Sequence, residues 1–330
     1  MRPLVLALCL VTPLLTLGCG SDQPANSPGG SAGSAGATSG GSSNGGSAGN
    51  GGSAGNGGSA GNGGSAGNGG NAGNGGNAGN GGSGGSNPGQ PGVVGMDGIG
   101  AWDALPANEK AKVTTNTSFF LHQSVGQDLE DGAEANGFPF EYCTSGSTDL
   151  ATGLNGGLFS TSNGDPAGKI AEFRSMALAN AGSGLRVAIM KFGYADIVEG
   201  KASGAQTAYQ AAVGDIKAAG VRVLHVTPPF VYNVPAENAP KMATRTWMME
   251  TFKDDIIFDL EDVESTNPDD GSRCERGGSW EICDNVRSTS GCSSKSQGVD
   301  APSGQGHICF DPHAKRLSKA FLYAIYLAAK

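Results

Sequence analysis

The sequence predicts an α/β protein, a three-layer α/β/α sandwich in which helices cover both faces of one parallel sheet. Short apolar runs alternate along the chain with longer segments whose apolar residues recur at helical spacing. The runs are apolar at most positions, as in strands that are buried on both faces. Strands and helices that alternate in this way connect into parallel sheets.

Five segments have the character of buried strands. They are residues 117–121, 140–143, 185–192, 221–226 and 256–260. The third reads Leu-Arg-Val-Ala-Ile-Met-Lys-Phe, and Pro228 and Pro229 end the fourth. Since helices separate the strands, the expected sheet is five-stranded and flavodoxin-like.

Helices are expected at residues 126–136, 169–179, 202–219 and 242–252, and from Pro312 onward. The helix at 202–219 has an apolar stripe made of Ala205, Ala208, Ala212, Ile216 and Ala219. Gly220 ends this helix. Asp311 is the expected N-cap of the last helix, with Pro312 at its first position. A Gly-rich loop is expected at residues 146–157.

The start of the chain has the pattern of an export signal. The apolar stretch from Leu4 to Leu17 has the length of a signal-peptide core and is too short to span a bilayer. It ends in Leu-Thr-Leu-Gly-Cys19, which resembles a bacterial lipobox. The resemblance implies a signal peptide at residues 1–18 and a lipid on Cys19. Gly20, where an aspartate would signal inner-membrane retention, implies the outer membrane or the cell surface.

Residues 19–95 are expected to form a disordered tether behind the lipidated cysteine. Most of this stretch is Gly, Ser, Ala and Asn with a Gly-Gly-Ser-Ala-Gly-Asn repeat, and it lacks the large apolar residues that build a core. The folded domain is therefore expected at residues 96–330. The formal net charge of −9 argues against nucleic acid and anionic membrane surfaces as partners. Contact with a membrane would come through the lipid anchor only.

The late cysteines predict disulfides. In an oxidising compartment, two bonds are expected among Cys274, Cys283, Cys292 and Cys309, and three pairings are open. Most of these cysteines lie in an irregular, polar insert at residues 266–306. Cys143 would stand outside these pairs, buried at the end of a strand. Neither a metal nor a cofactor is expected, because the chain has no Cys-x-x-Cys pair, no phosphate loop and no His/carboxylate pair of ligands.

Ser124 lies where the first expected strand runs into the first expected helix. A serine at such a join faces the same space as the free N–H groups that begin the helix. Nucleophilic hydrolases need this arrangement, a nucleophile beside donors for a developing oxyanion. The alternative is a plain helix N-cap, which is the commoner role of serine at this place.

Residues near the ends of other strands are expected to meet Ser124. In a parallel sheet the carboxyl ends of the strands share one edge, and ligand sites form there. Gly157 is expected after the second strand, Gly193, Tyr194 and Asp196 come after the third, and His307 precedes the last helix.

This layout resembles the SGNH/GDSL hydrolase family over residues 113–330. The family places its nucleophilic serine after the first strand in a Gly-Asp-Ser block, where this chain has His122, Gln123 and Ser124. Its second block is a glycine whose N–H serves the oxyanion hole, which implies Gly156 or Gly157.

The family's third block, Gly-x-Asn-Asp, carries an asparagine that donates to the oxyanion. The corresponding residues here are Gly193, Tyr194, Ala195 and Asp196, so alanine replaces the donor. Loss of one such donor typically costs about 100- to 1,000-fold in rate. Tyr194, Lys191 or Gln123 would have to replace it if the chain is active.

The family's last block is Asp-x-x-His just before the final helix. His307 precedes that helix, whereas His313 lies inside its first turn, and a general base must be free to turn toward the serine. His307 is therefore the favoured base and His313 the alternative, with Asp311 or Asp300 to orient the imidazole. His122 is expected beside the site, and His225 in the core.

The sequence thus predicts an exported, lipid-anchored serine hydrolase at the outer membrane or cell surface. Its expected substrate is an ester-bearing small molecule or glycan, such as a carbohydrate O-acyl group, or a lipid. Ser124 would attack the carbonyl carbon, His307 would accept the proton, and the N–H groups of Ser124 and Gly157 would hold the oxyanion. Ala195 and the altered histidine block favour the alternative, an inactive surface domain that binds a glycan or a protein.

Overall fold

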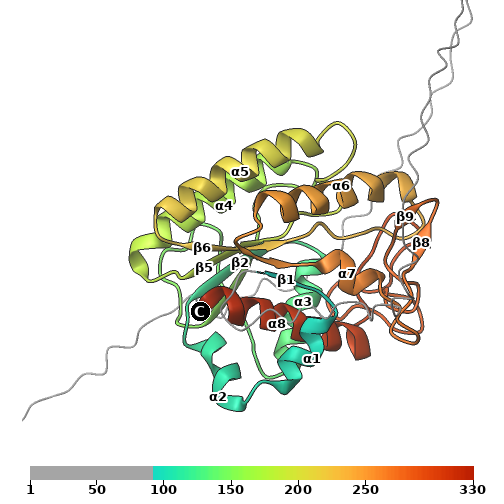
Figure 1. The fold of residues 1–330 in the computed structure, drawn as a ribbon, viewed down its shortest axis with the longest axis horizontal. Coiled ribbons are helices and arrows are strands. Elements are labelled where there is room, and N and C mark those ends of the chain that lie inside the picture. The colour runs from blue at the N-terminus through green and yellow to red at the C-terminus, as the bar shows by residue number, and fades with distance from the viewer. Residues whose placement is uncertain (1–91) are drawn as a thin grey trace, which may run out of the picture. The chain divides into compact units, whose positions relative to one another are not determined.

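The computed structural model describes residues 92–330 (Figure 1). The predicted signal peptide, the predicted lipidation site at Cys19 and nearly all of the predicted tether lie outside these residues. Among the helices of residues 92–330, none has the length and apolar character needed to cross a membrane.

Within the described residues, the main sheet has seven strands in the order β1-β7-β6-β5-β2-β4-β3, and every neighbouring pair is parallel. The strands are β1 Gly92–Val94, β2 Ser118–His122, β3 Glu141–Tyr142, β4 Leu154–Leu158, β5 Val187–Met190, β6 Arg222–Val226 and β7 Ile256–Phe258. The predicted α/β class is confirmed. The predicted count of five strands is wrong, because β1 and β4 were not expected.

β4 was hidden by its composition, Leu-Asn-Gly-Gly-Leu, inside the stretch expected to be a Gly-rich loop. Glycine is unfavourable in strands, but here it is required for close packing. A Cβ on Gly157 would overlap the carbonyl oxygen of Cys143, and one on Gly156 would overlap the Glu130 carboxylate. β4 therefore takes the central place next to β2, and β3, the expected second strand, lies at the edge.

β1 lies inside the range that was expected to belong to the tether. It pairs with β7, with Val93 opposite Ile257, so the folded part of the chain begins earlier than residue 96. Three residues are too few for a periodic pattern to predict a strand.

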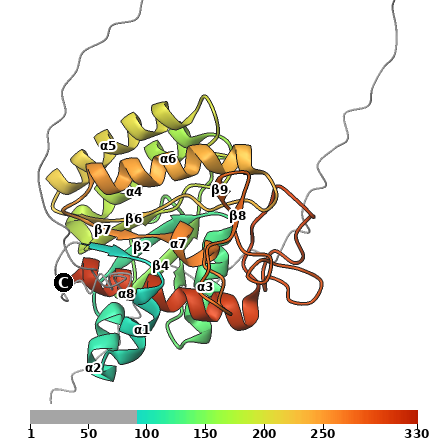
Figure 2. The same cartoon turned by 45° about the vertical axis from the view of Figure 1, so that its right-hand side comes forward.

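Two layers of helices cover the sheet (Figures 1 and 2). α4, α5 and α6 lie on one face, and α1, α3 and α8 on the other. The helices are α1 Asp97–Ala104, α2 Ala107–Lys110, α3 Val125–Ala135, α4 Pro166–Asn180, α5 Ala202–Ala218, α6 Pro235–Thr251, α7 Leu260–Ser265 and α8 Lys315–Ala329. α6 begins earlier than predicted because Pro235 starts it.

Each face of the sheet has its own apolar core. On the α8 side, Phe120, Phe258 and Phe321 pack together, with ring centroids 4.9 and 5.2 Å apart for the two pairs that include Phe321. On the α5 side, Phe173 and Tyr209 belong to the second cluster. Because the strands are buried on both faces, their sequences are continuous apolar runs and do not alternate between apolar and polar residues.

The insert is joined by two disulfides, as predicted. Cys274 pairs with Cys283 and Cys292 with Cys309, with Cα–Cα distances of 5.3 and 5.4 Å. Between the first two cysteines, β8 Glu275–Arg276 and β9 Ser279–Trp280 form a small hairpin. Cys143, directly after β3, is buried.

α3 and the start of α8 pack closely at Gly132. A Cβ on Gly132 would overlap the carbonyl oxygen of Ala314. Asn136 joins the same contact, because its Nδ2 donates to the carbonyl oxygen of Lys315 at 2.7 Å. The absence of a side chain at residue 132 therefore sets the distance between these two helices.

Replacing Gly132 by alanine should lower the free energy of unfolding by about 1–3 kcal/mol, the usual cost of overpacking. The matched control is Gly214→Ala on α5, where an added Cβ meets no atom within 4 Å. That change should raise the free energy of unfolding by about 0.5–1 kcal/mol, since alanine is the better helix former. Urea unfolding gives the free energy of unfolding of both variants. Equal changes at Gly132 and Gly214 would show that Gly132 does not pack closely against Ala314.

Candidate active site

Ser124 lies between the last residue of β2 and the first of α3, in a strained backbone conformation. Its φ is 57° and its ψ is −118°, a region that residues with a side chain rarely adopt. The flanking turn is held by Gln127 N–H, which donates to the carbonyl oxygen of Ser124 at 2.7 Å. Such strain costs on the order of 1–3 kcal/mol and occurs mostly at functional sites.

Ser124, His307 and Asp300 form a continuous hydrogen-bonded chain. The Ser124 Oγ lies 2.6 Å from the His307 Nε2, and the His307 Nδ1 lies 2.5 Å from an oxygen of the Asp300 carboxylate. The other oxygen of Asp300 accepts the backbone N–H of His307 at 2.9 Å. His307 is 5% exposed and Asp300 is 9% exposed, so the chain is largely shielded from water. Ser124 itself is partly exposed.

This geometry can activate a hydroxyl. A histidine that touches the serine can take its proton, and a carboxylate on the far ring nitrogen fixes the tautomer and stabilises the imidazolium that forms. The distance from Ser124 to His307 falls in the range of about 2.6–3.2 Å that proton transfer requires.

The alternative residues for base and acid lie elsewhere. His313 is in the turn Phe310–Ala314 that precedes α8, with Arg316 and Asp269 as its charged neighbours. Burial lowers the pKa of His313. The expected N-cap, Asp311, has an extended backbone, and its carboxylate pairs with the Lys315 ammonium group at 2.7 Å in solvent. It therefore neither caps the helix nor orients a histidine.

Asp300 comes from the Cys-rich insert, so the insert is part of the site. Ser288 joins the two partners within it, because its N–H donates to the carbonyl oxygen of His307 at 2.7 Å and its carbonyl oxygen accepts from Asp300 N–H at 3.4 Å. Asp300 precedes His307 by seven residues, a longer spacing than the one expected from the resemblance.

Tyr194 is the member of the expected third block that lies beside the nucleophile. Its ring meets the His307 ring edge to face, with centroids 6.1 Å apart. Burial raises the pKa of Tyr194, while hydrogen bonding to the side chains of Ser124 and Gln305 lowers it in part. The net direction is upward, so the hydroxyl stays protonated and can donate.

Gly193 and Asp196 have structural roles. The Asp196 carboxylate is fully buried and accepts three hydrogen bonds, from Gly193 N–H at 2.6 Å, Gly164 N–H at 2.7 Å and the Lys169 ammonium group at 2.7 Å. It ties the loop after β4 to the loop after β5. Gly193 N–H is therefore not free for an oxyanion, and Asp196 cannot touch a substrate.

His122, expected beside the site, and Gln123, a candidate substitute donor, hold neighbouring segments of the site in place. His122 is fully buried in β2, and its Nε2 lies 3.0 Å from the Glu130 carboxylate. The Gln123 side-chain amide donates to the carbonyl oxygens of Phe159 and Thr161 at 3.2 and 3.0 Å. It holds the loop after β4 and has no N–H group left for an oxyanion.

Gly157 was expected in a loop after the second strand, but it lies inside β4, opposite Leu121. A residue within the ladder does not present its N–H at the end of the sheet, so the predicted role of Gly157 is wrong. Lys191, another of the expected substitute donors, is fully buried and donates to the carbonyl oxygen of Phe192 at 3.0 Å.

Asn163, in the loop after β4, was not predicted. Its Oδ1 accepts from the Lys169 ammonium group at 2.8 Å and lies against Gly193. The hydrogen bonds within residues 92–330 leave its side-chain N–H group without a protein acceptor, so it is a further candidate donor at this edge. It was missed because Ser-Asn-Gly-Asp is typical of an ordinary turn.

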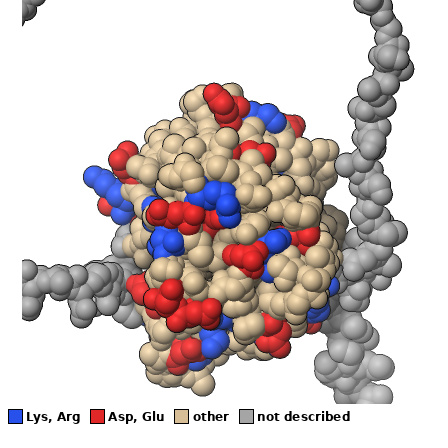
Figure 3. All heavy atoms as spheres, turned by 90° about the vertical axis from the view of Figure 1, so that its right-hand side faces the viewer, with Lys and Arg blue, Asp and Glu red and all other residues tan. Residues whose placement is uncertain are grey.

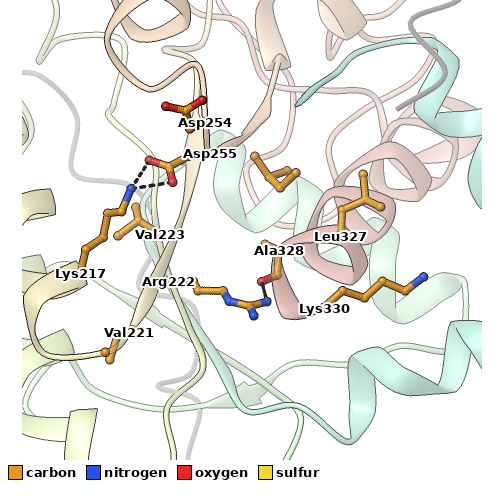
Figure 4. Close-up of a pocket in the computed structure, with 11 residues that line it drawn as sticks. Lys217, Val221, Arg222, Val223, Asp254, Asp255, Leu327, Ala328 and Lys330 are labelled. Atoms are coloured by element: carbon orange, nitrogen blue, oxygen red, sulfur yellow. Dashed lines mark hydrogen bonds and ion pairs between the residues drawn. The ribbon is translucent and has the colours of Figure 1, made fainter. Parts of the chain in front are cut away.

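One hollow among the described residues lies at the opposite edge of the sheet. It has a volume of about 370 Å³ and is lined by the amino ends of β6 and β7 and the end of α8 (Figure 4). Lys217 and Asp255 form an ion pair there at 2.7 Å. His225 lies behind it, fully buried as predicted, 3.0 Å from the Tyr209 hydroxyl and 3.3 Å from Asp255. This hollow is separate from the Ser124 site.

Residues 92–330 contain no group of three or more His, Cys, Asp or Glu side chains placed to hold a metal ion. The groups at the carboxyl edge of the sheet that can carry out acyl transfer are the side chains of Ser124, His307 and Asp300.

No family model matches this chain, and no curated protein matches it. Similar solved structures include the crystal structure of a "putative acylhydrolase" from Bacteroides fragilis NCTC 9343. The TM-score is 0.31 and the sequence identity is 12%, over 53% of this chain and 86% of that one. A likeness of this size says nothing about the activity of this chain.

Replacing Lys169 by methionine should lower the free energy of unfolding by about 3–5 kcal/mol, because the buried Asp196 carboxylate loses its compensating charge. The matched control is Arg174→Met on the same helix, whose pair with Asp215 has side chains 48% and 53% exposed. That change should cost less than about 1 kcal/mol. Denaturant unfolding gives the free energy of unfolding of both variants. A loss of less than about 1 kcal/mol in Lys169→Met would contradict the structural role of the Lys169–Asp196 pair.

Proposed function

We propose that this protein is a serine hydrolase of acyl esters. The observation that carries the proposal is the Ser124–His307–Asp300 chain, with 2.6 and 2.5 Å between its functional atoms. The strained backbone of Ser124 supports it, because a plain N-cap needs no positive φ and the Ser124 side chain makes no capping hydrogen bond.

The reaction follows from the contacts. The Ser124 Oγ attacks the ester carbonyl carbon as its proton passes to the His307 Nε2. The tetrahedral intermediate then collapses, and the departing alcohol takes the proton from His307, which leaves an acyl group on Ser124. Water attacks that group with His307 again as base, and the products are the alcohol and a carboxylic acid. The Asp300 carboxylate, bonded to the His307 Nδ1, stabilises the imidazolium that forms at each stage.

The oxyanion needs donors that differ from the family pattern. Within residues 92–330 the N–H of Ser124 donates to no protein acceptor, so it is available at the start of α3. The Tyr194 hydroxyl supplies the second donor in this proposal, in the place that Ala195 leaves empty. Its raised pKa and its position beside Ser124 support this role.

We further propose a divergent SGNH/GDSL-like hydrolase that is exported and lipid-anchored at the outer membrane or cell surface. The lipobox-like sequence at Cys19, the two disulfides and the order of elements support this. The proposed substrates are O-acyl groups of extracellular carbohydrates, or lipids. On the face that carries the insert, acidic and basic side chains are intermixed (Figure 3), which suits a substrate without a large net charge.

A fluorophosphonate probe should label the full-length protein on Ser124, because the activated oxygen displaces fluoride from phosphorus while His307 takes the proton. Ser124→Ala should abolish labelling. His307→Ala should lower the labelling rate about 100- to 10,000-fold, the usual contribution of a general base. Mass spectrometry of the labelled peptide and time courses of labelling measure these effects.

The matched control for the base is His313→Ala, which should label at the wild-type rate. If wild-type protein that is folded by circular dichroism stays unlabelled, the hydrolase proposal is wrong, and the surface domain that binds a glycan or protein is favoured. If His313→Ala is slow and His307→Ala is fast, the assignment of the base is wrong.

Tyr194→Phe should lower kcat/KM for a small acyl ester such as p-nitrophenyl acetate about 100-fold, because one oxyanion donor is lost while the ring against His307 remains. Tyr209→Phe is the control, since it removes a hydroxyl that bonds His225 on the other side of the sheet. Steady-state kinetics measure both. An unchanged kcat/KM in Tyr194→Phe would exclude its hydroxyl as a donor and direct attention to Asn163.

A further inference from the structure

Asp128 lies one helical turn after the nucleophile, at the point where α3 meets the segment that carries the base. It is 1% exposed. One carboxylate oxygen accepts the backbone N–H of Ile308, the residue after His307, at 2.9 Å. The other accepts the hydroxyl of Ser294 in the insert. A single buried side chain on the helix of Ser124 thus binds both the base segment and the segment that carries the acid.

We propose that Asp128 is a positioning residue that holds His307 at hydrogen-bonding distance from Ser124. This inference rests on the proposed hydrolase function for its kinetic consequences, while its structural claim concerns the placement of His307 alone.

The contacts of Ser294 extend this support to the acid. Its N–H donates to the Ser288 hydroxyl at 2.9 Å, and Ser288 in turn bonds the carbonyl oxygen of His307 and the N–H of Asp300. Asp128 is therefore connected through two residues to both ends of the His307–Asp300 pair. A shift of about 1 Å between nucleophile and base can cost on the order of 100-fold in rate, so this connection has a large expected effect.

The charge of Asp128 also acts on the site. The titratable groups that face its carboxylate are His307 from the base segment, Lys191 and Tyr194 from the loop after β5, and Asp131 from α3 itself. Burial raises the pKa of Asp128 to about 7, and the neighbouring His307 opposes this rise. An ionised Asp128 favours the protonated form of His307 by the same interaction.

Asp131 provides a matched control on the same helix. It is also an acidic residue that anchors the insert, because its carboxylate accepts the Ser296 hydroxyl at 2.5 Å, and it is 6% exposed. It does not bond the residues from 307 to 309. If Asp128 only fastened the insert to α3, the two residues would have similar effects when they are replaced.

The test compares wild type, Asp128→Asn, Asp128→Ala, Asp131→Asn and Ser124→Ala in the full-length protein. Labelling by a fluorophosphonate is timed from pH 5 to 9, and the His307 ring is titrated by NMR, with His307→Ala to assign its signals. Asp128→Asn can still accept from Ile308 N–H and donate to Ser294, so it removes the charge and keeps the contacts. Asp128→Ala removes the contacts as well, and the His307 signals in its NMR spectrum show whether the ring has moved even where the fold is weakened.

Asp128→Ala should label about 10- to 100-fold more slowly than wild type, while Asp131→Asn should keep the wild-type rate. In Asp128→Asn, the acidic limb of the rate profile and the NMR titration midpoint of His307 should both move to lower pH by roughly half a unit, because Asp128, with its pKa raised to about 7, is only partly ionised in this range. Ser124→Ala sets the unlabelled baseline.

Wild-type rates and an unmoved His307 midpoint in both Asp128 variants would overturn this inference and leave the hydrolase proposal standing. Equal losses in Asp128→Ala and Asp131→Asn would overturn it too, since they would show a common bracing role. An unlabelled wild type would refute the hydrolase proposal, and the His307 NMR signals of Asp128→Ala, compared with those of Asp131→Asn, would still decide whether Asp128 places His307.

Discussion

The site depends on how firmly residues 288–309 are held against α3, because the Ser124–His307 contact joins side chains that are 183 residues apart in the chain. The strand-to-helix turn presents Ser124 by local structure alone, but the base and the acid arrive from a segment with little regular secondary structure. That segment is placed by hydrogen bonds to the Asp128 carboxylate, by hydrogen bonds of the Ser288 backbone and by the Cys292–Cys309 disulfide. An irregular segment packed through polar contacts is stable only when each buried polar group has a hydrogen-bond partner, because an unpaired one costs free energy.

Sequence periodicity was enough to predict the α/β class, the central strands β2, β5, β6 and β7, and the join at which Ser124 lies. It missed β4, because Gly156 and Gly157 are typical of a loop in the sequence. Only the structure shows that these glycines are needed for close packing against Glu130 and Cys143. The resemblance to the hydrolase family favoured His307 as the base and, from its place before the final helix, included Asp300 among the candidate acids. It could not choose between Asp300 and Asp311, nor foresee Asp128, because those roles depend on contacts between distant segments.

Several buried charges lie behind the site and explain why Gly193 and Asp196 of the third block do not face it. Asp196 and Lys169 form a fully buried pair, which is tolerated only because further hydrogen bonds surround it. Burial lowers the pKa of Lys191 to about 7 and raises that of Glu264 well above its usual range. Part of this network is therefore uncharged near neutral pH, which reduces the cost of keeping it out of water. Sequence alone shows the charged residues but not their burial.

Asp300 and His307 both lie inside the loop that the Cys292–Cys309 disulfide closes, whereas Ser124 lies outside it. Local opening of a folded protein proceeds in cooperative units, and a covalently closed loop tends to move as one such unit. The Asp300–His307 pair therefore forms within the covalently closed loop, whereas the His307–Ser124 contact crosses from that loop to another part of the chain. The acid–base pair is thus held within one short loop of chain, whereas its contact with the nucleophile rests on how that loop packs against α3.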